Sequence, residues 1–329
     1  MRRVAVVVVN FNSGPCLGEC LKSLFRESPG LEIEVEVVDN GSTDGSPEAL
    51  RRDFPEVRLI RLGRNRGFAA AANISLRRIR DEGMADYVLL LNPDTVITGE
   101  AVVILADFLE SRQDVGAAGP ALLLPEGRFQ TGAGGFLPTA WTGLVYFLLL
   151  FKVLPKKTGS FFIDQAPFVM AGKPVEVEWI SGACLMVKRE VLSRAGLLDE
   201  RYPLYGEDIA WGKAMRRGGV GVCFVPSARV VHHHGYSSKK DGGEANPDWL
   251  EMVYRFVRRE GGVWEYGLFR FFSTMGFFMR WVGYSLAGWG GGGESVRQRA
   301  RDSLRFFAYS FSKRLRPARG EGMKRGLLA

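Results

Sequence analysis

The chain has 329 residues, of which 46% are hydrophobic, and a formal net charge of +8. This composition suits one large α/β domain with an appendage or two small domains, and it argues against a disordered chain. The charge is uneven, because residues 251–329 hold fifteen Lys or Arg and only six acidic residues, which leaves the first 250 residues almost neutral.

The cysteines and the N-terminus both bear on the cellular setting. Of four scattered cysteines only Cys16 and Cys20 are close together, and no second pair completes a zinc site, which favours a reduced, cytosolic setting. The apolar run that opens the chain is too short for a signal peptide, and Asn10 and Asn12 interrupt it. We therefore expect a buried first strand.

Strand, polar turn and helix alternate over the first 94 residues. We expect strands at residues 4–9, 33–38, 57–62 and 87–91, and helices at 15–26, 47–52 and 67–80. This order predicts a doubly wound parallel sheet, whose ligands bind beyond the carboxyl ends of the strands. The polar clusters at residues 10–13, 39–46 and 92–94 all fall at that edge.

The second half of the chain is less regular. Residues 132–153 cannot be ordered from their pattern, whereas a helix is expected at 209–216 and an apolar stretch at 220–231. Beyond about residue 248 aromatic residues alternate with arginines. Arg270 and Arg280 interrupt the apolar sequence, so no segment offers the roughly 18 apolar residues of a membrane-spanning helix.

The composition of this tail predicts an amphipathic helix at a membrane surface, with arginines that reach toward the lipid headgroups. A helical cap on the catalytic domain is the alternative. Nucleic acid is disfavoured, because the aromatics cluster as Phe-Phe pairs among apolar residues instead of forming a stacking platform.

Asp39 is the first candidate for ligand binding. Its carboxylate can accept hydrogen bonds from a nucleobase or a ribose hydroxyl, and a turn or helix-cap role is the structural alternative. No G-x-G-x-x-G motif follows the early strands and no P-loop motif occurs, which argues against NAD-binding proteins and P-loop nucleotide hydrolases.

Two groups of residues suggest a metal site. Asn92-Pro93-Asp94 offers oxygen ligands for Mg²⁺ or Mn²⁺, although Asn-Pro-Asp is also a common turn. The only histidines, His232, His233 and His234, are adjacent, and one of them could complete the site. A solvated polar loop is their alternative role.

Glu207 and Asp208 precede the expected helix at 209–216. Negative charge is stabilised at a helix start, so both residues suit a capping role. Their functional interpretation is that one of them is a general base that takes a proton from a hydroxyl group.

Six motifs, taken together in this order, resemble the family 2 glycosyltransferases, and most of all their bacterial rhamnosyltransferase-like branch. They are found at residues 6–12, 38–46, 65–69, 90–94, 179–183 and 206–208. The resemblance implies the GT-A nucleotide-diphospho-sugar transferase fold, a Rossmann-like mixed and mainly parallel sheet flanked by helices. It places this domain at residues 1–248 and leaves a basic, aromatic-rich helical extension at 249–329.

The resemblance also implies roles for matching positions. The catalytic residues would be Asp208, as the base, and Glu207. Donor binding would involve Asn10, Asn12, Asp39, Asn65, Arg66, Gly67 and Asn92. Acceptor binding would involve Trp179, Ser181, Gly182 and Trp211. Asp94 and His232 would hold Mg²⁺ or Mn²⁺, and the histidine block, followed by Gly235 and Ser237, resembles the family's late histidine. Because Asn92 replaces an aspartate, the ion would depend mainly on Asp94 and on the donor's phosphates.

The function implied is inverting transfer of a sugar from a nucleotide diphosphate donor, dTDP-rhamnose or a UDP-sugar, to a saccharide or lipid-linked acceptor in cell-envelope polysaccharide or glycolipid synthesis. The protein would be cytoplasmic and peripheral at the inner face of the cell membrane. A nucleotidyltransferase would need a glycine-rich basic loop after the first strand, which residues 10–13 do not supply. A non-catalytic module that binds nucleotide sugar or membrane is the other alternative, and the carboxylates of Asp94 and Asp208 argue against it.

Overall fold

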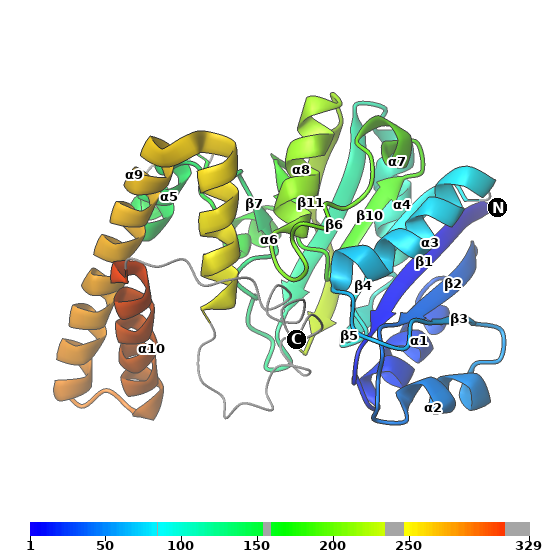
Figure 1. Ribbon diagram of the computed structural model, residues 1–329, viewed down its shortest axis with the longest axis horizontal. Coiled ribbons are helices and arrows are strands. Elements are labelled where there is room, and N and C mark those ends of the chain that lie inside the picture. The colour runs from blue at the N-terminus through cyan, green and yellow to red at the C-terminus, as the bar shows by residue number, and fades with distance from the viewer. Residues whose placement is uncertain (84, 154–158, 234–246, 313–329) are drawn as a thin grey trace, which may run out of the picture. The chain divides into compact units, whose positions relative to one another are not determined.

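The computed structural model describes residues 1–83, 85–153, 159–233 and 247–312 (Figure 1). By packing, residues 1–135 with 162–233 form one compact unit, and residues 136–153 and 159–161 with 247–312 form a second. The domain boundary at residue 248 stays a prediction, and most of the stretch that the sequence left unordered belongs to the second unit. His234, Gly235, Ser237 and residues 313–329 lie outside the described residues.

A nine-stranded mixed sheet forms the first unit, in the order β3-β2-β1-β4-β10-β6-β11-β5, with β8 paired to β11. Strands β1 to β4 are mutually parallel where they pair, whereas β10 runs antiparallel between β4 and β6. A second, two-stranded sheet pairs β7 (Gly134–Gly135) with β9 (Trp179–Ile180). The strands of the large sheet are β1 (Arg2–Asn10), β2 (Leu31–Asp39), β3 (Arg58–Arg61), β4 (Tyr87–Leu91), β5 (Thr95–Thr98), β6 (Val115–Leu123), β8 (Val175–Val177), β10 (Cys184–Lys188) and β11 (Gly221–His232).

Helices cover both faces of this sheet, because successive side chains of a strand point to opposite sides. In β1, Val4, Val6 and Val8 share one core with α1 and α4, and the alternate residues share the other with α3 and α8. All four cysteines are buried and free. The helices of this unit are α1 (Cys16–Arg26), α2 (Ser46–Asp53), α3 (Phe68–Glu82), α4 (Ala101–Ser111), α6 (Gln165–Ala171), α7 (Val191–Arg194) and α8 (Glu207–Arg217).

The expected α/β class is confirmed, with a mixed, mostly parallel sheet flanked by helices and followed by a helical C-terminal region. Each strand and helix expected in the first 94 residues is present, with ends that differ by no more than two residues from those expected. The carboxyl ends of β1, β2 and β4 meet at one edge of the sheet. The polar clusters therefore lie together, as the strand pattern predicts.

The second unit is a helical cluster of α5 (Ala140–Phe147), the 3₁₀ helix η1 (Leu150–Lys152), α9 (Asp248–Trp289) and α10 (Glu294–Phe311). Helix α9 bends at Gly262, where φ is +82°, a conformation that favours glycine. The bend folds α9 back on itself (Figure 1), so that the hydroxyl groups of Tyr254 and Ser273 lie 2.6 Å apart. Phe147 packs against Phe269 and Phe277 in the core of this unit.

The expectation that Arg270 and Arg280 reach outward to lipid headgroups is wrong. Arg280 donates hydrogen bonds to the carbonyl oxygens of Phe147 and Tyr146, at 3.0 and 3.1 Å, and burial lowers its pKa. Arg270 donates from Nε to the carbonyl oxygen of Ser310 at 2.7 Å. Both guanidinium groups satisfy carbonyls at helix ends, which have no partner within their own helix. Within the described ranges no helix is long and apolar enough to span a bilayer.

Candidate active site

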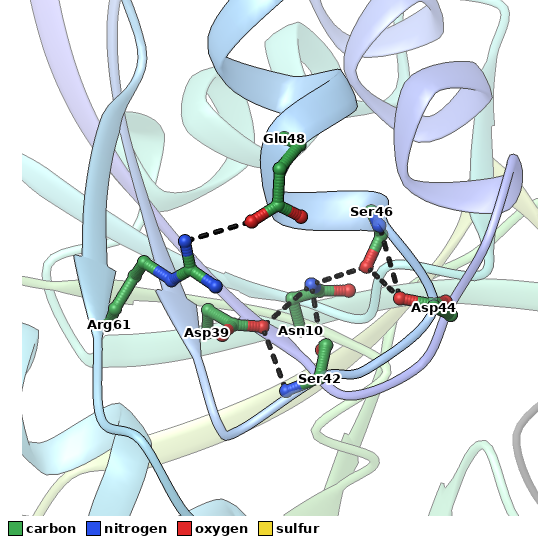
Figure 2. Close-up of polar contacts among 7 residues, drawn as sticks. All are labelled: Asn10, Asp39, Ser42, Asp44, Ser46, Glu48 and Arg61. Carbon is green, nitrogen blue, oxygen red and sulfur yellow. Dashed lines mark hydrogen bonds and ion pairs between the residues drawn. The ribbon is translucent and has the colours of Figure 1, made fainter.

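Asn10, the last residue of β1, organises the polar turn that follows β2 (Figure 2). Its side chain is buried, and Nδ2 lies 3.0 Å from Oδ1 of Asp39, 3.1 Å from Oγ of Ser42 and 2.9 Å from Oγ of Ser46. Its Oδ1 accepts a hydrogen bond from Ser13. Both polar atoms of the Asn10 amide are therefore hydrogen-bonded to other protein groups. This geometry gives Asn10 a role in holding Asp39 and argues against direct contact with a ligand.

The turns after β1 and β2 are tied together by a second asparagine. Asn12 has a positive φ of 50°, and its Oδ1 accepts a hydrogen bond from the backbone N–H of Thr43 at 2.8 Å. Its own N–H donates to Oγ of Ser42 at 3.0 Å. The parallel register pairs Asn10 with Asp39, so both turns begin at the same level of the sheet.

The next loop is held by Asn40, which the sequence motifs did not single out. Its Nδ2 donates to Oδ1 of Asn65 at 3.0 Å, and its Oδ1 accepts from the N–H of Arg66 at 2.8 Å. Oδ1 of Asn65 also accepts from the N–H of Gly67 at 2.8 Å. The sequence feature that could have identified Asn40 is its position next to Asp39, at the end of a strand. The side chains of Asn65 and Arg66 remain exposed beside this network.

Gly67 brings this loop against the segment that leads to α8. Its φ is +87°, and a Cβ at this position would lie 2.9 Å from both Cβ and the carbonyl oxygen of Pro203. The N–H of Phe68, at the start of α3, donates to that same oxygen at 2.7 Å. Four residues beyond Pro203 the chain reaches Glu207. The expected donor loop and the expected catalytic segment are thus in direct contact.

The expected metal ligands also lie together. Register in the antiparallel pair of β5 and β11 places His232 opposite Thr95, next to Asp94. The Nε2 atom of His232 lies 3.1 Å from Oδ1 of Asp94 and 3.3 Å from Nδ2 of Asn92, and both His232 and Asp94 are buried. His233 contributes its backbone N–H to the carbonyl oxygen of Asp94.

Gln130 fixes the orientation of this imidazole and was not identified from the sequence. Its Oε1 lies 2.8 Å from Nδ1 of His232, and Gln130 is itself buried. An amide oxygen accepts only, so Nδ1 of His232 donates a hydrogen bond to it. The other ring nitrogen, Nε2, faces Oδ1 of Asp94 and the Asn92 amide. A lone glutamine in an irregular stretch carries no signal that sequence reasoning could use.

The turn between β9 and β10 connects the Asn92 region with Asp208. The backbone N–H of Gly182 donates to Oδ2 of Asp208 at 3.4 Å, and the next residue, Ala183, accepts at its carbonyl oxygen from the N–H of Asn92 at 2.9 Å. Ser181 begins this turn, and its N–H donates to the carbonyl oxygen of Ala133. Two adjacent residues, Gly182 and Ala183, therefore hold the two halves of the site beside each other.

Burial raises the pKa of two adjacent carboxyl groups, those of Glu207 and Asp208. The pKa of Glu207 is raised well above its ordinary value by burial and by the neighbouring charge of Asp208, and its Oε2 has no hydrogen-bond partner in the described part of the chain. Burial raises the pKa of Asp208 to about 6, while the backbone N–H groups of Ile209 and Gly182 favour its ionised form. The pKa of both carboxyl groups is therefore raised by burial, and that of Glu207 is raised further by its neighbour.

The two tryptophans expected at the acceptor side lie in the core. Trp211 is 1% exposed, and its indole N–H donates to the carbonyl oxygen of Gly196 at 2.9 Å. Trp179 is buried against Phe162. Packing therefore explains Trp211 fully and argues against direct contact with an acceptor. Trp179 would act by supporting the turn at Ser181 and Gly182.

A family model described as glycosyl transferase family 2 matches residues 5–156. The N-acetylglucosaminyl-diphospho-decaprenol L-rhamnosyltransferase of Mycobacterium tuberculosis is 31% identical over 270 residues, which are 79% of this chain and 86% of that protein. The dTDP-rhamnosyl transferase RfbF of Shigella flexneri is 26% identical over 238 residues, 72% of this chain and 71% of that protein.

Solved structures are similar in fold at low identity. A mannosyltransferase from Pyrobaculum calidifontis, in complex with GDP-Man and Mn²⁺, matches with a TM-score of 0.52 at 18% identity, over 94% of this chain and 86% of that one. GalNAc-T7 with UDP, GalNAc and Mn²⁺ matches with a TM-score of 0.53 at 16% identity, over 80% of this chain and about half, 51%, of that one.

Proposed function

The chain belongs to the family 2 glycosyltransferases, in their rhamnosyltransferase branch, and has the GT-A fold. From this premise we propose that it transfers a sugar, with inversion at the anomeric carbon, from a nucleotide diphosphate donor to a hydroxyl acceptor. One observation carries the proposal: the turn at Gly182 and Ala183 bonds to both Asp208 and Asn92, next to the pair of Asp94 and His232.

The nucleoside of the donor lies, in this proposal, at the polar turns after β1 and β2. Asp39 is held by Asn10 and Ser42 at the end of β2, where a carboxylate can accept hydrogen bonds from a pyrimidine base or a ribose. The exposed side chains of Asn65 and Arg66 suit the ribose and the diphosphate. The name of the Shigella flexneri relative favours dTDP-rhamnose as the donor, and a UDP-sugar is the second candidate.

A divalent ion fits the pair of Asp94 and His232, because one carboxylate oxygen and one imidazole nitrogen, 3.1 Å apart, form a donor set suited to Mn²⁺ and also compatible with Mg²⁺. No cluster of three or more His, Cys, Asp or Glu side chains with metal-site geometry occurs in residues 1–83, 85–153, 159–233 and 247–312. Two protein ligands leave positions for the donor's phosphates. Such an ion would offset the negative charge of the leaving diphosphate.

Asp208 is the base in the proposed mechanism. Its carboxylate takes the proton of the acceptor hydroxyl as that oxygen bonds to the anomeric carbon, and the bond between that carbon and the diphosphate breaks on the opposite face. A pKa of about 6 leaves Asp208 ionised at neutral pH yet more basic than an ordinary aspartate. Burial and the charge of Asp208 raise the pKa of Glu207, which disfavours a second negative charge beside the base.

The acceptor proposed is a saccharide, free or carried on a lipid diphosphate, in the synthesis of cell-envelope polysaccharide or glycolipid. The name of the Mycobacterium tuberculosis relative, which specifies a diphospho-decaprenol acceptor, supports the lipid-linked class. We propose that the enzyme works at the inner face of the cell membrane and that its C-terminal extension makes the peripheral contact. The exposed aromatic residues of α9 support this placement.

A donor screen tests the proposal. The full-length protein is incubated with dTDP-rhamnose, UDP-glucose, UDP-galactose and GDP-mannose, each with Mn²⁺ or Mg²⁺ and with a lipid-linked N-acetylglucosamine acceptor, and release of nucleoside diphosphate is recorded. We expect release with one donor that requires the acceptor and is lost in EDTA. Tight donor binding without release would instead support a non-catalytic module.

A further inference from the structure

We propose that one face of α9, between Trp264 and Trp289, is a membrane-binding surface that lies flat on an anionic lipid bilayer. This inference rests on the peripheral membrane contact proposed above and assigns it to particular residues. The α9 apolar face consists of the large apolar side chains that α9 exposes from Trp264 onward, namely Trp264, Leu268, Phe271, Met275, Phe278, Met279, Val282, Leu286 and Trp289.

The spacing of these residues puts them on one side of the helix. Steps of three and four residues follow the 3.6-residue turn, so the side chains form a continuous stripe. At about 1.5 Å per residue the stripe is roughly 37 Å long. Monomeric proteins in water rarely leave so many large apolar side chains exposed together without a binding role.

No charge interrupts the α9 apolar face. From Trp264 to Trp289 the charged residues are Glu265, Arg270 and Arg280. Glu265 accepts from the backbone N–H of Ala140, and both arginines donate to backbone carbonyl oxygens inside the second unit, so all three bond away from the face. Because the two arginines point inward, an apolar sequence that they interrupt still gives an apolar surface.

The two ends of the face carry the most exposed tryptophans, Trp264 at 89% and Trp289 at 90%. Indole rings are enriched at membrane interfaces, where the ring contacts lipid and the N–H remains hydrated. No helix in the described portion of the chain qualifies as membrane-spanning. A helix with a tryptophan at each end of one apolar face is therefore suited to lie in the plane of the interface.

Basic residues flank the α9 apolar face in the sequence, and this favours an anionic lipid surface over a neutral one. Arg258 and Arg259 precede the bend in α9, and Arg297, Arg299 and Arg301 are exposed on α10. In sequence, residues 313–325 add six Lys or Arg and one Glu. Basic residues next to an anionic membrane are attracted to its surface charge.

A second copy of the chain is the competing occupant, because the spacing of the stripe also resembles a coiled-coil seam. Coiled coils flank such a seam with charged residues that set partner and register. Here the exposed positions beside the stripe include Gly267, Gly283 and Ala287, which are uncharged. The arginines around the face would moreover repel those of a second copy. The charges therefore favour lipid.

The test measures binding of the full-length protein to vesicles, without donor or acceptor. Vesicles of phosphatidylcholine with 30% phosphatidylglycerol, a composition chosen at roughly physiological anionic content, are compared with pure phosphatidylcholine. The triple variant Trp264→Ser, Leu286→Ser and Trp289→Ser removes three exposed side chains of the face. Met170→Ser, which changes an apolar residue 83% exposed in the first unit, is the matched control.

We expect wild type and control to sediment with anionic vesicles, and the triple variant to bind at least tenfold more weakly. Equal vesicle binding by wild type and triple variant, or no binding by wild type, would overturn the inference. So would a wild-type dimer in sedimentation velocity that the triple variant converts to monomer without change in vesicle binding. Donor turnover with a soluble saccharide acceptor, assayed without lipid, distinguishes a wrong surface from a wrong enzymatic function.

Discussion

The Nε2 atom of His232 lies 3.1 Å from Oδ1 of Asp94, although the two residues are 138 positions apart in the chain. Pairing of β5 with β11 sets this approach, since His232 lies opposite Thr95. Gln130 accepts from the other ring nitrogen and so holds the ring with its Nε2 atom directed at Asp94. The pair is thus fixed by backbone register and by one buried amide.

The role of Gln130 predicts an effect on metal affinity. Gln130→Leu removes the acceptor for the Nδ1 proton, and loss of such an outer partner typically weakens metal binding about 10–100-fold. Gln130→Glu keeps an acceptor oxygen and should bind metal nearly as wild type does. Mn²⁺ binding in the presence of nucleoside diphosphate, followed by electron paramagnetic resonance, measures both. Equal affinities in the leucine and glutamate variants would show that Gln130 does not orient a ligand.

Asp208→Asn should abolish sugar transfer while donor binding is kept. The amide preserves the hydrogen bonds from Gly182 and Ile209 in part but cannot take a proton, so kcat should fall about 10²–10⁴-fold. Isothermal titration with the nucleotide sugar gives donor affinity, and single-turnover kinetics give the transfer rate. Wild-type turnover in this variant would rule out Asp208 as the base.

The raised pKa of Asp208 also predicts a pH profile. Because its carboxylate must be ionised, kcat should rise with pH through about 6 and level off above it. Rates measured with donor and acceptor at saturation from pH 4.5 to 8.5 test this expectation. A profile already flat at pH 5 would contradict the assignment, since an ordinary aspartate is ionised there.

The same raised pKa predicts that the ionised carboxylate of Asp208 lowers the free energy of unfolding at neutral pH. A carboxyl group with a raised pKa in the folded state favours folding below its unfolded pKa, near 3.9, and this contribution is lost as pH rises through about 6. At pH 7.5 Asp208→Asn should therefore be more stable than wild type, by on the order of 1 kcal/mol. Urea unfolding at pH 7.5 and pH 4 should show this gain only at the higher pH.

Gly67→Ala tests the contact between the donor loop and the catalytic segment. A Cβ there meets Pro203 at 2.9 Å and also requires a positive φ, so both stability and donor affinity should decrease. Gly63→Ala is the matched control, because it shares the positive φ but has open space around it. Thermal unfolding and donor titration of both variants separate the two effects. Equal donor affinity in the two variants would mean that this contact does not shape the donor site.

Local sequence patterns predicted the first half of the fold well. The β-branched run of β1 and the polar turns after Asp39 and Leu91 mark buried parallel strands and their ends, and they place Asp39 and Asp94 at one sheet edge. The antiparallel insertion of β10 could not be predicted in this way, because strand order depends on long-range pairing. Residues 132–153 were ambiguous because their partners are distant in the sequence: β7 pairs with β9, and α5 packs on α9, about a hundred residues further on.

Side-chain roles were harder to predict than backbone structure. A motif predicts which residues are near the site but not which side chains face it. Trp211 lies in the core, and the side-chain amide of Asn10 is hydrogen-bonded to other protein groups. Gln130 and Asn40 act through side-chain hydrogen bonds to residues distant in the sequence, and such contacts leave no periodic signal. Arg270 and Arg280 point inward because they donate hydrogen bonds to backbone carbonyl oxygens of the second unit. Composition alone cannot predict these acceptors.

The anomeric configuration of the product tests the central claim most directly. With the active donor and its acceptor, the glycosidic bond is examined by nuclear magnetic resonance, for wild type and for Asp208→Asn. We predict that wild type releases one nucleoside diphosphate per sugar transferred and gives a linkage of configuration opposite to that of the donor, and that the variant gives neither. A linkage that retains the donor's configuration would contradict an inverting transferase with Asp208 as its base.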